Sequence, residues 1–331
     1  MARIASRLAA AIVALLLGSG ALAQTSPTQS GFPSKPIRLI VPFPPGAGTD
    51  AIARLVAQRI GEQLGTGGPG IVVDNRTGAG GAIGAEAVAK SAPDGYTLLF
   101  VASPFTTVAA ASRAASYDPI VDFASVAGIA AGPLVFVAGP SLTARSIPEL
   151  IAMARARPGV INYGSAGTAS VNHLALELLR QRAGIDIVHI PYKGIGPASA
   201  DLLGGQIETL TATIAAMLPH LRQGKVRALA VTGTTRIALL PEVPTMIEQG
   251  VPDYDVVNYW GIVAPARTPR VIIERLNAEI QQLLAAPALQ TRLNAEGAAP
   301  IPGTPEKFSA FLRADLAKWR ALIVEAGLKL D

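Results

Sequence analysis

Two short loops carry the residue types best suited to holding a small anion. The first runs from Phe43 to Asp50 and the second from Ser165 to Ser170, and each directly precedes a segment with helical spacing. Unpaired backbone N–H groups and the positive end of the helix dipole favour an anion at such a position. Neither loop contains Lys or Arg. We therefore expect a carboxylate held by neutral donors and water, not a polyphosphate.

The hydroxyl groups in these loops would add directional hydrogen-bond donors. The residues that we expect to bind the ligand in the two loops are Phe43, Pro44, Gly46, Ala47, Gly48, Thr49, Asp50, Ser165, Ala166, Gly167, Thr168 and Ser170. Lys193 follows in the segment PYKG and is the one cation added to this set. Contact with an anion and a solvated turn position are equally compatible with its sequence context.

Other kinds of chemistry find little support in the residues. The first loop lacks the Gly-Lys-Ser/Thr of a phosphate-binding loop and the third glycine of a dinucleotide fingerprint. The chain has no cysteine, and His173, His189 and His220 lack the spacing of a zinc site. We therefore expect no metal and no cofactor.

A hydrolase would need a catalytic serine, and no G-x-S-x-G segment is present. A secreted serine hydrolase using Ser165 or His173 remains as an alternative. A loop-bracing or structural role is the favoured interpretation of His173. His189, in the apolar run IVHIP, is expected to be a satisfied core histidine.

The first residues indicate export. Arg3 and Arg7 are followed by the apolar run Leu8–Leu17 and by the small-x-small segment Ala21–Ala23. This order is typical of a secretory signal peptide, with an uncleaved anchor as the alternative. Cleavage after Ala23 would leave 308 residues with a net charge of +3 in the periplasm. The basic residues are dispersed, which argues against nucleic-acid binding.

Short β-rich runs alternate with amphipathic segments, which predicts an α/β fold. Ser146 and Glu149 have the spacing of a capping box, and Thr268 and Thr304 each precede a proline at an expected helix start. Strands are expected at 37–41, 71–74, 96–102, 134–138, 161–164, 187–190, 226–231 and 259–264. Helices are expected at 51–64, 84–90, 146–157, 198–203, after Ser170 as far as Gly184, and in the last third of the chain.

Several segments, in this order, resemble the substrate-binding proteins of tripartite tricarboxylate transporters, the Bug family of Gram-negative bacteria. They are Pro36–Gly46, Asp74–Gly81, Ala92–Leu98, Asn162–Gly167, Pro191–Gly194, Asp201–Gln206, Arg227–Val231, Leu240–Thr245, Trp260–Gly261 and Ala264–Pro265. The resemblance runs from about Phe32 to the end of the chain.

The resemblance implies a type II periplasmic binding protein fold, with two α/β lobes, a ligand cleft and two crossing hinge strands near 134–138 and 258–263. Lobe 1 would comprise 32–135 plus 259–331, and lobe 2 would comprise 136–258. It also implies a probably monomeric receptor that closes on a small organic acid and delivers it to a membrane permease of the tripartite tricarboxylate type. A sensor that presents its closed form to a membrane kinase is the alternative.

The sequence departs from the family pattern around the implied cleft. Gly46-Ala47-Gly48 stands where three glycines are usual, and Thr106–Ala109 replaces a His-x-x-Asn pattern. The segment Glu208–Thr213 also differs from its usual composition. The stretch that starts at Ser103 borders the cleft in relatives, so Ser103 joins the expected ligand-binding residues. The anchoring loops carry over, whereas the identity of the ligand does not.

Overall fold

The computed structural model describes residues 31–46, 48–64, 70–112 and 116–328. The chain divides into two compact units, Met1–Ser34 and Lys35–Asp331, and all strands and helices of the described residues belong to the second. The expected signal peptide, its cleavage point after Ala23, and Ala47 lie outside the described residues. Within the described ranges, no helix is long and apolar enough to cross a membrane.

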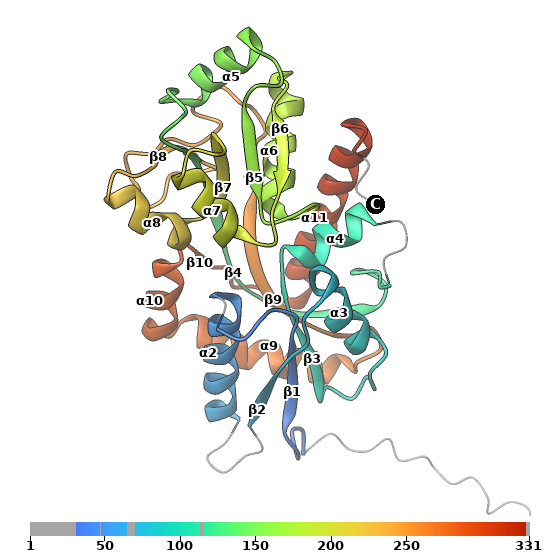
Figure 1. Ribbon diagram of the computed structural model, residues 1–331. Helices are drawn as coiled ribbons and strands as arrows, with labels where there is room; N and C mark the ends of the chain where they lie inside the picture. Colours follow the sequence, from blue (N-terminus) through green and yellow to red (C-terminus); the bar gives the residue numbers. More distant parts are fainter. Residues whose placement is uncertain (1–30, 47, 65–69, 113–115, 329–331) are drawn as a thin grey trace, which may run out of the picture. The chain divides into compact units, whose positions relative to one another are not determined.

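The strands of this second unit form one continuous sheet (Figure 1). Their order is β2-β1-β3-β9-β4-β7-β5-β6, with β8 and β10 also paired to β4. Pairing is parallel within β2-β1-β3 and within β7-β5-β6, and antiparallel around β9 and β4. The bounds are β1 Ile37–Val41, β2 Ile71–Asn75, β3 Thr97–Ala102, β4 Phe123–Ala138, β5 Asn162–Ser165, β6 Val188–Pro191, β7 Thr209–Thr213, β8 Arg227–Val231, β9 Val257–Pro265 and β10 Ala299–Pro300.

Helices connect the parallel strands and pack on the sheet, as parallel connections require. Near β1, β2 and β3 lie α2 and α3, whereas α5, α6 and α7 lie near β5 and β6 (Figure 1). The bounds are α2 Gly48–Gln63, α3 Ala82–Ala89, α4 Pro104–Ala111, α5 Ile147–Ala156, α6 Val171–Ala183, α7 Ile195–Leu203, α8 Ile214–Arg222, α9 Arg270–Leu284, α10 Pro287–Ala295 and α11 Pro305–Glu325, with a short 3-10 turn at Ala79–Gly81.

Strand β4 joins the two parallel parts of the sheet. Its residues 123–133 pair with β9, and its residues 134–138 pair with β7 and β8. Leu134 and Phe136 pack in one hydrophobic cluster, whereas Val135 and Val137 pack in another. Because successive side chains of a strand point to opposite faces, this segment contributes to the cores on both sides of the sheet.

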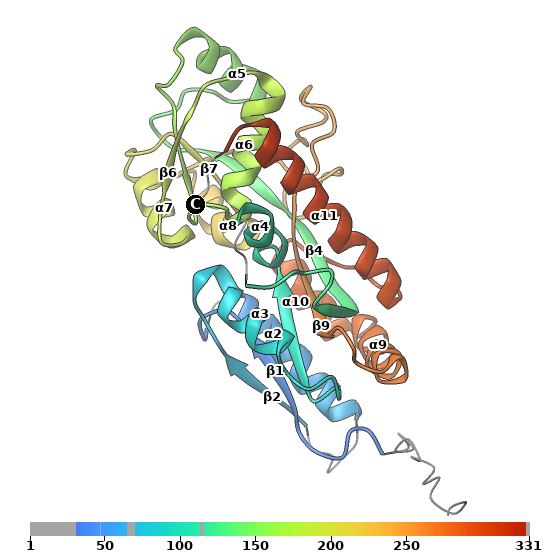
Figure 2. The same cartoon turned by 90° about the vertical axis from the view of Figure 1, so that its right-hand side faces the viewer.

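Helix α11 also contributes to two cores. Phe308 and Leu316 pack with side chains of β3, α4 and β9, whereas Trp319 and Leu322 pack in the cluster that includes Leu134. Figure 2 shows α11 running from beside α6 toward α9. The last helix therefore ties the end of the chain to both parts of the sheet.

Most expected elements are confirmed, some with shifted ends. Ser146 accepts the N–H of Glu149 at 3.3 Å, but the Glu149 carboxylate accepts from Arg145 instead of closing the box on Ser146. Thr304 caps α11 as expected. The expected cap at Thr268 is wrong: its hydroxyl donates to the Pro265 carbonyl, and Pro269 occupies the cap position.

Helix α2 begins earlier than expected, at Gly48, so Thr49 and Asp50 lie in its first turn. Several regular segments were not expected from the sequence. They include the first part of β4, strands β7 and β10, and helices α4 and α8.

Candidate functional site

The loop between β1 and α2 is folded around the carboxylate of Asp50, which is only 2% exposed. One oxygen of Asp50 accepts the backbone N–H of Gly46 at 2.9 Å and the Arg54 guanidinium at 2.9 Å. The other oxygen accepts the Asn75 amide at 2.8 Å. That amide also donates to the Phe43 carbonyl at 2.9 Å, so the end of β2 holds both ends of the loop.

These bonds decide the charge of Asp50. Burial alone would raise the pKa of this carboxyl, but the hydrogen bonds from Arg54, Asn75 and the Gly46 N–H outweigh burial and lower the pKa below 3.8. A carboxylate that accepts several N–H bonds stays ionised for this reason. Asp50 therefore braces the loop as an anion at neutral pH.

Two expected site hydroxyls are bonded to the start of β9. The indole N–H of Trp260 donates to Thr49 Oγ1 at 3.1 Å. Ser103 is buried, donates to Asn258 Oδ1 at 2.9 Å and accepts the Tyr259 N–H at 3.2 Å. Both roles of the Ser103 hydroxyl are thus filled inside the protein. Sequence reasoning included the Trp260-Gly261 motif but assigned no role to Trp260.

The loop between β5 and α6 is built on the hydroxyls of Ser165 and Ser170. Ser165 is fully buried; its Oγ accepts the Gly167 N–H at 3.1 Å and lies 2.7 Å from His189 Nε2. Ser170 Oγ donates to the Gly167 carbonyl at 2.7 Å and accepts the His173 N–H at 3.3 Å, which makes Ser170 the cap of α6.

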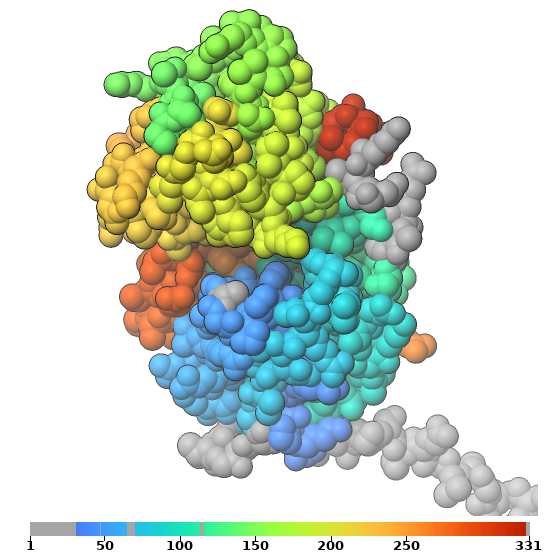
Figure 3. Space-filling model, viewed as in Figure 1, coloured from blue at the N-terminus to red at the C-terminus, as the bar shows by residue number. Residues whose placement is uncertain are grey.

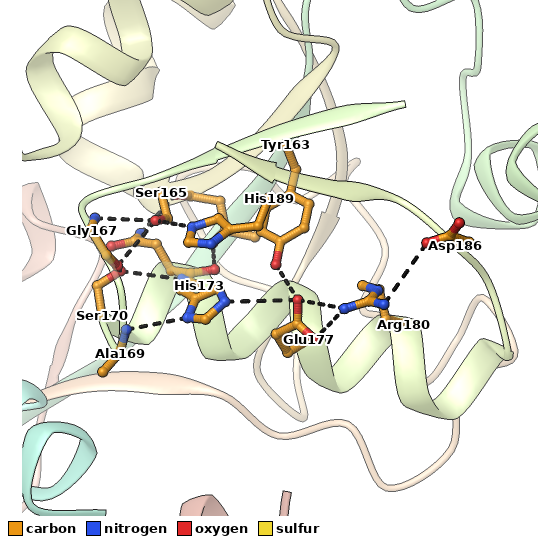
Figure 4. A network of polar contacts seen from close by, with 12 residues as sticks. Tyr163, Ser165, Gly167, Ala169, Ser170, His173, Glu177, Arg180, Asp186 and His189 are labelled. Atoms are coloured by element: carbon orange, nitrogen blue, oxygen red, sulfur yellow. Dashed lines mark hydrogen bonds and ion pairs between the residues drawn. The ribbon is translucent and has the colours of Figure 1, made fainter. Parts of the chain in front are cut away.

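A buried polar network lies behind this loop (Figure 4). His173 Nδ1 accepts the Ala169 N–H at 3.2 Å, and its ring stacks on His189 with centroids 3.8 Å apart. On the far side, Glu177 is 1% exposed and accepts the Tyr163 hydroxyl and two bonds from Arg180 at 2.7 and 2.9 Å. The loop-bracing interpretation of His173 is confirmed.

Burial sets the protonation of this network. It lowers the pKa of His173 to about 4, with a further lowering from the Arg180 charge. It also lowers the pKa of His189 to about 4, aided by His173. Burial and then the Glu177 charge raise the pKa of Tyr163. At neutral pH the loop thus rests on two uncharged imidazoles and a neutral phenol.

Some donors of the second loop are left open. Within the described residues, the N–H groups of Ala166 and Thr168 and the Thr168 hydroxyl have no protein partner, and Thr168 is exposed. Lys193 is exposed and, in the described part of the chain, forms no ion pair. Figure 3 shows a hollow between the blue residues of α2 with its preceding loop and the yellow residues above them.

The expected residues therefore fall into two groups on separate elements, and within the described ranges no hydrogen bond joins the two loops. Phe43, Pro44, Gly46, Gly48, Thr49 and Asp50 surround the start of α2, and Ser103 lies at the start of α4. Ser165, Ala166, Gly167, Thr168 and Ser170 precede α6, and Lys193 lies between β6 and α7. A separate cavity of about 650 Å³, lined in part by residues 233–239 and 297–299, contains none of them.

Neither metal chemistry nor a catalytic triad is assembled among these groups. The described residues contain no group of three or more His, Cys, Asp or Glu side chains placed to hold a metal ion. His173 faces Ala169, so the imidazole beside Ser165 is that of His189. In the described part of the chain, no carboxylate is hydrogen-bonded to His189. The arrangement is therefore suited to holding a ligand, and it lacks the oriented base of a triad.

Comparison with known proteins places this chain in a family. A family model described as the tripartite tricarboxylate transporter family receptor matches residues 52–328. The chain is 38% identical over 327 residues to Protein BugT of Bordetella pertussis. The aligned region covers 98% of this chain and 99% of BugT.

Two similar solved structures are described with a bound carboxylate. One is R. palustris Rpa4515 with adipate, which is 35% identical, with a TM-score of 0.79 and coverage of 89% of this chain and 98% of that chain. The other is MatC from Rhodopseudomonas palustris with bound malate, which is 30% identical, with a TM-score of 0.76 and coverage of 88% and 100%. The fold is that of periplasmic binding proteins. The chain belongs to the tripartite tricarboxylate transporter receptor family, whose members are solute-binding receptors and not enzymes.

Proposed function

We propose that this chain is an exported receptor that captures a small organic carboxylate between the loops 43–50 and 165–170 and delivers it to a permease of the tripartite tricarboxylate type. The observation that carries the proposal is the second loop: a rigid turn before α6 whose Ala166 and Thr168 N–H groups lack a protein partner in the described structure. Free N–H groups at a helix start are suited to a carboxylate. Two relatives described with adipate and malate support the same ligand class.

The site divides into contacts and braces in this proposal. Thr49, Ala166, Gly167, Thr168 and the loop residues 43–48 contact the ligand, and Lys193 adds a positive charge at the rim. Asp50, Ser103, Ser165 and Ser170 hold the loops in shape, because their polar atoms are bonded inside the protein. Asp50 could not itself bind an anion, since two carboxylates side by side repel each other.

The same proposal includes closure of two lobes, 32–135 plus 259–331 and 136–258. Strand β4 changes partners between Pro133 and Leu134, which supports a boundary at this point. A ligand that contacts both loops would stabilise the closed arrangement by touching both lobes only there. The end of α11 packs with residues of the second lobe, so it would move relative to one of the two lobes on closure.

The test is a thermal-shift screen of residues 24–331 against adipate, malate, succinate, citrate, glutamate, nicotinate and an aromatic dicarboxylate. One acid should raise the melting temperature in a concentration-dependent way, because a ligand bound only by the folded state stabilises it. The protein should first be unfolded and refolded, to remove ligand acquired during expression. Absence of any shift after refolding would overturn the carboxylate assignment.

Delivery needs a separate test. The liganded and empty receptor should be compared for capture of detergent-solubilised permease subunits. Retention of the permease by the liganded form supports transport, whereas retention of a kinase ectodomain instead would favour the sensor alternative.

Two further measurements test export and oligomeric state. N-terminal sequencing should show that the exported protein begins at Gln24, and gel filtration should give the size of a monomer.

A further inference from the structure

The hydroxyl groups near the proposed site differ in which of their two hydrogen-bond roles is already filled. Ser103 donates to Asn258, and Ser170 donates to the Gly167 carbonyl. Ser165 lies within bonding distance of both His189 and the Gly167 carbonyl. These three hydroxyl hydrogens have acceptors inside the protein, so they are not required to point at a ligand.

Thr49 is different. The only bond of its hydroxyl within the described residues is the one from Trp260 Nε1, at 3.1 Å. An indole N–H is a donor and never an acceptor, so the Thr49 oxygen must accept, and the hydroxyl hydrogen is left to donate elsewhere. Thr49 is half-buried in the first turn of α2, where the dipole of the helix also favours a negative group.

Trp260 is well placed to impose this orientation. Trp260 is 4% exposed, and its backbone lies in β9 between Ala102 of β3 and Ala130 of β4. A side chain on a central strand is held more firmly than one on a loop. The bond joins two residues 211 positions apart, so it fixes the start of α2 against the middle of the sheet.

We infer that Trp260 is a positioning residue for the ligand: its indole N–H holds the Thr49 hydroxyl as an oriented donor, and that donor binds an ionised carboxylate. The inference rests on the proposed function and deepens it, because it names the group that recognises the acid. Thr168 also carries an open hydroxyl, but it is exposed, and no side chain among the described residues is hydrogen-bonded to it. Trp260 thus acts through Thr49.

The affinity test is a double-mutant cycle measured by calorimetric titration, with adipate and malate as probes. Thr49→Val keeps the shape and removes the donor, and affinity should fall about tenfold, as for a hydrogen bond to a charged group. Trp260→Phe keeps the ring packing and should weaken binding about threefold. In the Thr49→Val background, Trp260→Phe should change affinity by less than about twofold, because its effect passes through Thr49. Thr49→Ser should restore most of the affinity.

The outcomes separate the inference from the function. If the wild-type protein binds acids but Trp260→Phe weakens binding equally with and without the Thr49 hydroxyl, the inference is wrong and the receptor function stands. If the wild-type protein binds no acid of the panel, the proposed function fails. Trp319→Phe is the matched control, since its indole donates to Asp315 and not to the site. It should leave the affinity unchanged.

A second measurement needs no ligand. The chain has two tryptophans, so an amide correlation spectrum shows two indole N–H signals, and either Trp→Phe variant assigns both. Thr49→Val should move the Trp260 signal and leave the Trp319 signal in place, whereas Thr49→Ser should move neither. A Trp260 signal that Thr49→Val leaves unmoved would overturn the inference without reference to any acid.

Discussion

His173 Nδ1 accepts the backbone N–H of Ala169 at 3.2 Å, and this single contact fixes the tautomer of the ring. A nitrogen that accepts carries no hydrogen, so the hydrogen of the neutral imidazole is on Nε2. Nε2 lies 3.7 Å from the Glu177 carboxylate. The Glu177–Arg180 pair thus lies behind the proposed binding loop and favours the one tautomer that can hold Ala169.

Replacing His173 should therefore loosen the loop. In His173→Phe the Ala169 N–H loses its acceptor, in a residue already in the left-handed region with φ 61°. We expect the free energy of unfolding, measured in urea, to fall by about 1–3 kcal/mol. His173→Gln retains an acceptor and should recover part of the loss. Equal losses in both variants would show that the Ala169 bond contributes little.

Acid should destabilise the fold through His173 and His189. The pKa values of these two histidines are lowered to about 4 in the folded protein, from 6.5. Between these values the unfolded chain binds more protons, so the stability is present above pH 6.5 and is lost as the pH falls toward 4. For buried His173, the loss between pH 7.5 and pH 5 is about 2 kcal/mol. Urea midpoints at the two pH values measure it, and His173→Gln/His189→Gln should reduce the difference.

Asp50→Asn should affect both stability and affinity. The amide cannot accept all the bonds that hold the first loop, so unfolding should become easier by about 1–3 kcal/mol and acid binding should weaken. Asp74→Asn is the matched control on β2. Its ion pairs with Arg38 and Arg76 are partly exposed, and it should cost less than about 0.5 kcal/mol. An Asp50 variant no different from this control would contradict the bracing role.

Glu177→Gln tests the buried pair behind the second loop. The change leaves Arg180 without its counter-charge and weakens the bond to Tyr163. Because the Arg180 side chain is 33% exposed, the cost should be about 2 kcal/mol, below that of a fully buried pair. Glu86→Gln breaks an exposed pair with Lys90 on α3 and should cause no measurable change. Thermal and urea unfolding of the two variants make the comparison.

The sequence predicted those elements whose stability is locally encoded. The run Ile37–Val41 is mostly apolar and contains the β-branched residues Ile37, Ile40 and Val41, and its predicted ends agree with β1. The first part of β4 was missed because it consists largely of Ala and Gly. A Cβ on Gly128 would lie 2.7 Å from Ile301 and 3.1 Å from Phe308 of α11, so contacts with residues far away in the sequence require the small residue. The local pattern of apolar residues cannot predict a contact with residues so far away in the sequence.

The site likewise combines features that the local sequence predicts with features that depend on distant residues. The two loops could be recognised from composition and from their place before helices. The residues that brace them could not, because Asn75, Trp260 and His189 reach them from other strands. One signal was available: Asn75 is the last residue of β2, and the ends of neighbouring parallel strands meet at one edge of a sheet. The partner of Thr49, 211 residues later, had no such signal.

Helix α11 has a consequence for how the chain reaches its native state. Trp319 and Leu322, close to the end of the chain, complete a core that begins with Leu134, and Phe308 completes one that includes Ile40. Neither core can close until nearly the whole polypeptide has been made. If the chain is exported unfolded, as the proposed function implies, neither core could be completed before helix α11 had crossed the membrane.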